Sequence, residues 1–134
     1  MSYPTIRHIT VDCSGDPYDL GLFWSAVLGR PLHDDDQPGD PAALIAGPAG
    51  SPGLLFIRVP EDKAVKNRLH LDLQPPAGTT ITAEVERIRS LGGRVLDDRR
   101  TPEGRGWVVF ADPEDNEFCV ELSVSEREAL GLGD

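Results

Sequence analysis

The chain has 134 residues, the size of one domain or of two small modules that share a core. It carries 13 Lys and Arg residues against 23 Asp and Glu residues, and its net charge of −10 argues against nucleic-acid binding. Its two cysteines form no disulfide framework, which fits a reducing compartment. The sequence shows no signal peptide and no apolar stretch long enough to span a bilayer, so we expect a cytoplasmic protein without membrane partners.

The first half of the sequence predicts a strand and a helix. Residues 6–13 alternate polar and apolar side chains, as in a half-buried strand, and the polar face carries His8. Asp16 is a good N-cap, and proline follows it at the first helical position. The helix buries an apolar face that includes Trp24 and ends at Gly29.

Further strands are predicted at residues 42–46 and 54–59, within loops rich in Pro and Gly. The second half repeats the order. A strand at residues 69–74 is followed by a helix that Thr79 or Thr80 caps.

The remaining elements are three strands and a short helix. The strands are expected at residues 94–97, 106–111 and 117–122, with turn chemistry between the last two. Ser125 and Glu128 form a plausible capping box for the terminal helix.

The two halves look like a repeat. Residues 28–35 line up with residues 91–98, with four of eight positions identical, and His8 lines up with His70 at nearly the same offset. Coincidence between two helix ends is the alternative. Halves of this size hold too little core to be stable alone, so we expect them to pack together, within the chain or across a dimer.

A pseudo-twofold pairing of these halves would bring His8 and His70 face to face across a concave sheet surface. The last strand has a matching polar face, formed by Glu117, Cys119 and Glu121. A sheet whose hollow is lined by polar side chains is a common small-molecule site, so the sequence predicts a ligand pocket here.

Three segments resemble the vicinal-oxygen-chelate superfamily, which includes glyoxalase I, bleomycin-resistance proteins and extradiol dioxygenases. They are His8-Ile-Thr-Val-Asp-Cys-Ser with the helix that follows, Lys66-Asn-Arg-Leu-His-Leu-Asp-Leu, and Trp107-Val-Val-Phe-Ala-Asp-Pro-Glu-Asp-Asn-Glu-Phe-Cys. The resemblance covers roughly residues 6–122 and is closest to the small bacterial glyoxalase-like branch. Such a superfold hosts many chemistries, so the resemblance is more specific for the fold than for an activity.

The resemblance implies an α+β fold. Two βαβββ modules would form a cupped, mostly antiparallel eight-stranded sheet with helices outside, as a single domain over residues 1–134. Module one would span about residues 5–60, module two about 67–123, and a short helix would follow at 125–131. The resemblance also implies a homodimer.

Metal-using members of the superfamily take four ligands from equivalent strands. His8 and His70 match the first and third positions, but Ile57 falls on the second and cannot bind a metal. Cys119 falls on the fourth, with Glu121 two residues further on the same face. A divalent metal (Zn, Fe, Mn or Ni) could bind only with movement from the family geometry, and the alternative is that both histidines are hydrogen-bonding cavity residues.

Other residues keep two interpretations each. Cys119 is a reactive thiolate beside a protonated histidine or a small buried side chain. Glu117 and Glu121 are general bases or solvated, salt-bridged carboxylates. Trp107 starts a strand beside a Gly-rich turn, where its indole could flank a flat ligand.

One basic group stands out in the acidic chain. It could bind an anionic ligand, or it could be solvated loop charge. Its members are Lys63, Lys66, Arg68, Arg99, Arg100 and Arg105.

These observations favour a small-molecule-binding protein without the full metal site. A metal-dependent lyase, isomerase or dioxygenase is the alternative, with Glu121 as candidate base. Whether the protein is an enzyme stays open. The expected ligand-binding residues are His8, His70, Asp72, Trp107, Cys119 and Glu121.

Overall fold

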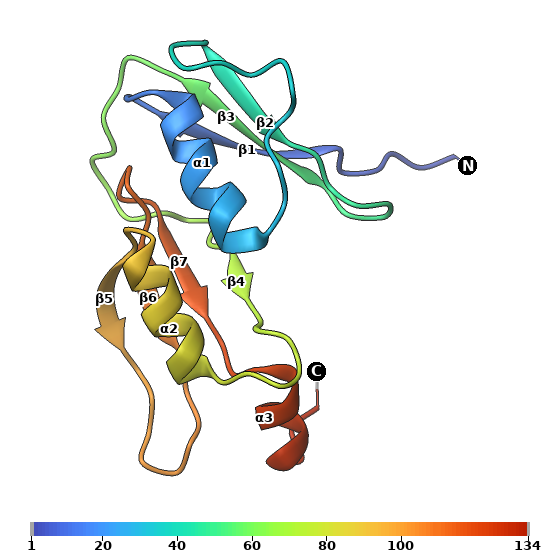
Figure 1. Ribbon diagram of the computed structural model, residues 1–134, viewed down its shortest axis with the longest axis vertical. Coiled ribbons are helices and arrows are strands. Elements are labelled where there is room, and N and C mark those ends of the chain that lie inside the picture. Colours follow the sequence, from blue (N-terminus) through green and yellow to red (C-terminus); the bar gives the residue numbers. More distant parts are fainter. Residues whose placement is uncertain (1, 134) are drawn as a thin grey trace. The chain divides into compact units, whose positions relative to one another are not determined.

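The computed structural model describes residues 2–133, and the chain divides into two units between Ala64 and Val65. The first unit contains β1 (His8–Cys13), α1 (Pro17–Leu28), β2 (Ala42–Ile45) and β3 (Gly53–Arg58) (Figure 1). The second contains β4 (Asp72–Leu73), α2 (Ile81–Ser90), β5 (Arg94–Asp98), β6 (Val108–Ala111), β7 (Glu117–Val120) and α3 (Val124–Ala129). Two sheets and three helices in the described part confirm the predicted α+β class.

Helix α1 begins and ends where its sequence predicts. The Asp16 side chain accepts a hydrogen bond from the backbone of Tyr18, Pro17 follows at the start of the helix, and Gly29 ends it with a φ of 66°. Trp24 is only 3% exposed, which confirms its expected place in the core.

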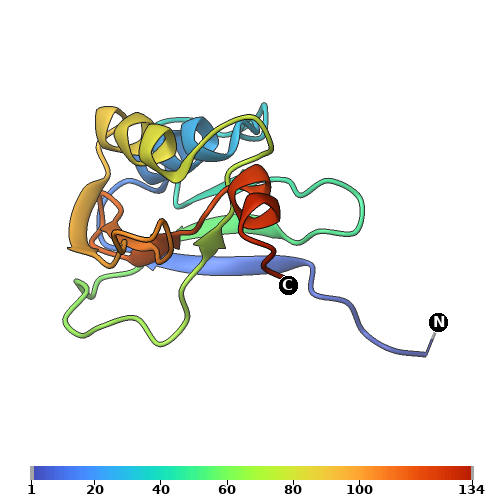
Figure 2. The same cartoon turned by 90° about the horizontal axis from the view of Figure 1, so that it is seen from below.

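The first unit packs α1 on one face of a three-stranded sheet with the order β1-β3-β2 (Figure 2). Strands β1 and β3 run parallel, and β2 is antiparallel to β3. The buried face carries Phe56, Ala43 and Ile45, while His8 and Thr10 alternate onto the other face. The segment before β1 extends away from the strand (Figure 1).

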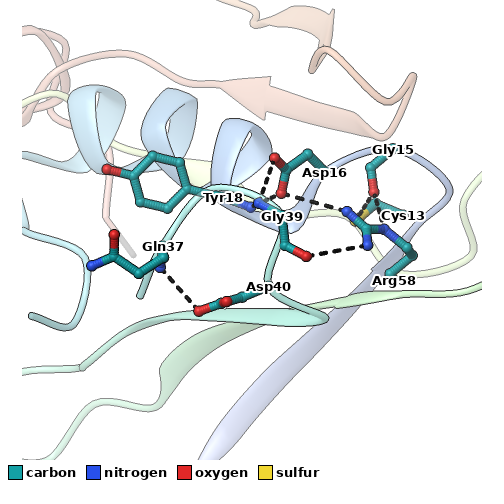
Figure 3. Close-up of polar contacts among 8 residues, drawn as sticks. All are labelled: Cys13, Gly15, Asp16, Tyr18, Gln37, Gly39, Asp40 and Arg58. Atoms are coloured by element: carbon teal, nitrogen blue, oxygen red, sulfur yellow. Dashed lines mark hydrogen bonds and ion pairs between the residues drawn. The ribbon is translucent and has the colours of Figure 1, made fainter. Parts of the chain in front are cut away.

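A polar cluster fixes the loop before β2 against the start of α1 (Figure 3). Besides capping the helix, Asp16 accepts a hydrogen bond from the amide of Gly39 at 3.0 Å. Arg58, at the end of β3, lies 3.6 Å from the Asp16 carboxylate and donates to the carbonyl oxygens of Gly15 and Gly39. One carboxylate therefore joins three segments of the first unit.

The second unit has a four-stranded sheet with the order β4-β7-β6-β5. Thr80 caps α2, which packs Ile81, Val85 and Ile88 into the core. Phe110 and Phe118 are buried and stacked, with ring centroids 5.4 Å apart. Helix α2 therefore covers the apolar face, and the sheet's other face is left for polar side chains.

Several strands are one or two residues shorter than predicted, and two predicted elements need a specific correction. The strand expected at residues 69–74 shrinks to Asp72–Leu73. The terminal helix is capped by Ser123 and Glu126, which form the box two residues before the predicted Ser125 and Glu128. The S-x-x-E pattern occurs twice in this segment, at Ser123 and at Ser125. The buried Ser123 caps the helix, whereas the Ser125 hydroxyl accepts a hydrogen bond from the backbone amide of Gly78.

The two units repeat one topology, with a difference in strand number. In each sheet the first strand pairs in parallel with the last, and the remaining pairs are antiparallel. The eighth expected strand is reduced to an isolated bridge between Leu32 and Ile45, so the described residues hold seven strands in two sheets. Leu32 is the residue that the sequence repeat aligns with Val95 of β5.

None of the helices among residues 2–133 is long and apolar enough to cross a bilayer.

Candidate functional site

A pocket of about 420 Å³ opens on the polar face of the second unit. It contains four of the six predicted ligand-binding residues, and every lining residue belongs to this unit. The lining consists of Asp72, Arg105, Gly106, Trp107, Cys119, Glu121, Leu122, Arg127 and Leu132.

The strand register explains how distant residues meet at this pocket. In the parallel pair, Asp72 of β4 lies opposite Cys119 of β7. Since side chains alternate along a strand, Glu121 lies on the same face as Cys119, about 6.6 Å further along. Two carboxyl groups and a thiol therefore form a row on the side of the sheet opposite the phenylalanine core.

Trp107 reaches the pocket from the next strand. Val108 pairs with Val120 in the antiparallel β6–β7 ladder, so Trp107 continues the face that carries Cys119 and Glu121. The indole is 44% exposed, and the Arg99 guanidinium lies 5.9 Å from its ring centroid, within range of a cation–π contact. The indole thus forms part of the pocket lining, and its contact with a ligand stays a prediction.

Gly106 holds the turn that precedes this tryptophan. Its φ is 99°, and a Cβ there would come within 2.0 Å of the Arg99 carbonyl oxygen. A side chain at this position would force the hairpin apart, so glycine is required for the close approach.

Two arginines complete the lining, and sequence reasoning assigned neither to the pocket. Arg105 lies in the hairpin between β5 and β6, and sequence analysis placed it only in the basic group. Arg127 comes from α3, where its guanidinium donates to the Gly133 carbonyl oxygen. The pocket therefore combines anionic, cationic, aromatic and aliphatic groups, as small-molecule sites do.

The surroundings of Cys119 favour its thiol form over the thiolate. Burial raises the pKa of the Cys119 thiol, and the charge and hydrogen bond of Asp72 and the charge of Glu121 raise it further. Lys66 acts in the opposite direction on the same pKa. The interpretation of Cys119 as a low-pKa thiolate finds no support in this environment.

His70 does not line this pocket. It is exposed, and its Nε2 lies 2.9 Å from the Nζ of Lys66. Lys66 lies next to Asn67, whose amide donates to the Glu117 carboxylate at 3.2 Å. Glu117 thus anchors this connector to the start of β7, as a structural contact.

His8 lies in the first unit, in a separate open hollow of about 800 Å³. The neighbouring strand places Gly53 directly opposite His8, while Ile57 lies opposite Asp12. Ile57 is therefore about 13 Å along the strand from the position beside His8. The facing of His8 and His70 across one cavity stays a prediction.

Among the described residues, the second unit shows no divalent metal site of its own. No group of three or more His, Cys, Asp or Glu side chains within residues 2–133 is arranged to hold a metal ion. In the second unit, burial and the neighbouring carboxylates raise the pKa of the thiol at the family's fourth position, and the Lys66 Nζ lies 2.9 Å from the Nε2 of the histidine at the third.

Comparisons with known proteins agree on the fold. A glyoxalase-related enzyme from Fulvimarina pelagi superposes with a TM-score of 0.65 at 17% identity, covering 89% of this chain and 88% of that chain. FosX from Listeria monocytogenes, a fosfomycin resistance protein solved with Mn(II) and 1S,2S-dihydroxypropylphosphonic acid, gives 0.63 at 15%, covering 95% of each chain.

A third structure, the antibiotic binding protein TnmS3 from Streptomyces sp. CB03234, gives a TM-score of 0.57 at 20% identity and covers 90% of this chain and 97% of that chain. No curated protein sequence matches the chain. The model of the glyoxalase-like domain family matches residues 8–121, nearly the whole length. The chain therefore belongs to the glyoxalase-like domain family.

Proposed function

We propose that this protein binds a small organic molecule in the second-unit pocket, without a metal ion. The observation that carries the proposal is the convergence of Asp72, Trp107, Cys119 and Glu121 on one cavity of about 420 Å³. That volume lies within the range of pockets that hold small ligands. TnmS3, which has a similar fold, is an antibiotic binding protein, and this supports the proposal.

Each part of the pocket has a stated role in this proposal. The Trp107 indole offers a flat apolar surface, with the Leu122 and Leu132 side chains nearby. The Glu121 carboxylate accepts hydrogen bonds from the ligand and is the candidate base if a proton is removed. Arg105 binds an anionic group of the ligand.

A metal-dependent lyase, isomerase or dioxygenase is the second candidate function. The Mn(II) present in the FosX structure favours it. In that case His8 and His70 would be ligands. Ile57 at the family's second ligand position and the Lys66 contact at His70 argue against it.

A fragment screen by thermal shift and chemical-shift perturbation tests the proposal. Hits that bind the pocket should lose at least about tenfold in affinity in Trp107→Ala and Glu121→Gln, which corresponds to about 1.4 kcal/mol. Glu103→Gln removes the same charge from an exposed loop position and serves as the matched control. Hits that bind all three variants equally would place binding elsewhere and refute the pocket assignment.

A metal scan separates the two candidate functions. EDTA-stripped protein is melted with Mn, Fe(II), Co, Ni or Zn, where a metal at 100 times its dissociation constant stabilises by about 2.7 kcal/mol. A rise in melting temperature that His8→Ala removes would favour the metal enzyme. Organic ligands that bind after chelation would favour the metal-free module.

We further propose a cytoplasmic homodimer. The dimer rests on the resemblance to the family, and the location rests on the two cysteines without a disulfide framework. A sedimentation mass near one chain at micromolar concentration would contradict the dimer.

A further inference from the structure

The contact between Lys66 and His70 indicates which ring nitrogen of the imidazole accepts a hydrogen bond. An ammonium carries three donors and no acceptor, so the Nε2 of His70, 2.9 Å from the Lys66 Nζ, must accept the hydrogen bond. The tautomer that fits this contact carries its proton on Nδ1. The lone pair that a metal would take at Nε2 is occupied by an organic cation.

The chain around Lys66 is held in place by hydrogen bonds between side chains and backbone groups. The Asn67 amide donates to the Glu117 Oε1 at 3.2 Å, and the Glu117 amide donates to the Asn67 Oδ1 at 3.4 Å. The side-chain amide of Asn67 also donates to the Leu69 carbonyl oxygen. This reciprocal pairing with the start of β7 places Lys66 beside the polar row of the sheet.

We propose that the Lys66 ammonium takes the place of a metal ion at His70, so that the second unit carries its own cation and excludes transition metals from this histidine. The inference rests on the proposed function in that both describe a metal-free site. It concerns the chain's own residues and needs no organic ligand for its test. If Lys66 proves not to exclude metals from His70, the proposal that the pocket binds an organic ligand still stands. If the pocket binds no ligand, the inference about Lys66 and His70 still stands.

The first test is the tautomer of His70 in the full-length chain. Long-range ¹H–¹⁵N NMR of the imidazole, assigned with His70→Ala, should show the proton on Nδ1 in the wild type. In Lys66→Met, which keeps the length of the side chain and removes its charge, this tautomer should lose its preference. A wild-type His70 with its proton on Nε2 would overturn the proposal.

The second test is calorimetric titration of EDTA-stripped protein with Ni²⁺ alone. Lys66→Met should bind Ni²⁺ at least about tenfold more tightly than the wild type, and His70→Ala in that background should abolish the gain. Lys66→Arg should behave as the wild type, because the cation is kept. Lys63→Met is the matched control, since it changes the net charge equally at a nearby position.

Two results would overturn the proposal in this assay. The first is wild-type Ni²⁺ binding that His70→Ala weakens. The second is equal affinity in Lys66→Met, Lys63→Met and the wild type. Far-ultraviolet circular dichroism checks that each variant is folded, and if Lys66→Met unfolds, the wild-type tautomer alone decides.

Discussion

We expect Asp16→Ala to destabilise the first unit more than the removal of any exposed carboxylate in that unit. The carboxylate caps α1 through the Tyr18 amide and holds the Gly39 amide, both at 3.0 Å. It also lies 3.6 Å from Arg58, which is 41% exposed (Figure 3). The substitution removes all three interactions at once.

The magnitude follows from the separate contributions. Loss of an N-cap costs about 1 kcal/mol, and loss of a hydrogen bond to a charged acceptor costs about 1.5 kcal/mol. The half-exposed ion pair adds at most about 0.5 kcal/mol. We expect a total of about 2 to 3 kcal/mol, which lowers the melting temperature by roughly 8 °C in a protein of this size.

The assay is urea unfolding followed by circular dichroism, with hydrogen exchange at the Gly39 amide as a local readout. Asp19→Ala is the matched control, because Asp19 is exposed in the first turn and contributes only about 0.5 kcal/mol through the helix dipole. A double-mutant cycle with Arg58→Met isolates the ion pair. If Asp16→Ala costs no more than Asp19→Ala, the cluster does not hold the loop and our reasoning fails.

Three further predictions concern the second unit. Iodoacetamide should alkylate Cys119 more slowly than free cysteine at pH 8, and Asp72→Asn should accelerate the reaction, because removing the carboxylate lowers the thiol pKa. Asp112→Ala should cost about 2 to 4 kcal/mol by urea unfolding, since the buried Asp112 carboxylate accepts hydrogen bonds from two backbone amides and one side-chain amide. Arg100 lowers the pKa of Asp98 from 3.8 to about 2, so Asp98 stabilises the fold above pH 3.8 and loses this effect as the pH falls to about 2. Asp98→Asn should flatten the acid dependence of stability in that window.

The refuting results are distinct for each of these. Alkylation of wild-type Cys119 at the rate of free cysteine would contradict the raised pKa. Asp112→Ala within about 0.5 kcal/mol of the wild type would show that the turn holds without its carboxylate. An unchanged acid slope in Asp98→Asn would show that the contact with Arg100 does not persist in solution.

Local sequence signals predicted the helices well, because their ends depend on neighbouring residues. The capping rules correctly place the ends of α1 at Asp16, Pro17 and Gly29. They also identify Thr80 as one of two candidate N-caps of α2, and it is the one observed. The terminal helix was misplaced by two residues because Ser123 and Ser125 present the same local pattern. Only tertiary burial of Ser123 distinguishes them.

Alternation along strands predicted half of the site. It put Cys119 and Glu121 on one face, and the parallel pairing with Asp72 then completed the row. Strand alternation could not identify Arg127, because this residue reaches the pocket from helix α3. The position of that helix against the sheet depends on tertiary contacts, which a local sequence pattern does not predict. The shortening of the strand around His70 is also non-local, since contacts between Asn67 and Glu117 hold that segment.

The two-residue strand β4 has a consequence for the dynamics of the pocket. It brings Asp72 to the site through a very short parallel pairing with the far end of the unit's sequence. Such a pair closes late in folding, because a long stretch of chain must be ordered first. It also frays first in the native state, which would open one wall of the pocket without unfolding the rest. A ligand that contacts Asp72 would thus stabilise the pairing of β4 with β7. The Cys119 and Glu121 amides donate to the carbonyl oxygens of Leu71 and Leu73, so ligand binding should slow hydrogen exchange at these two amides.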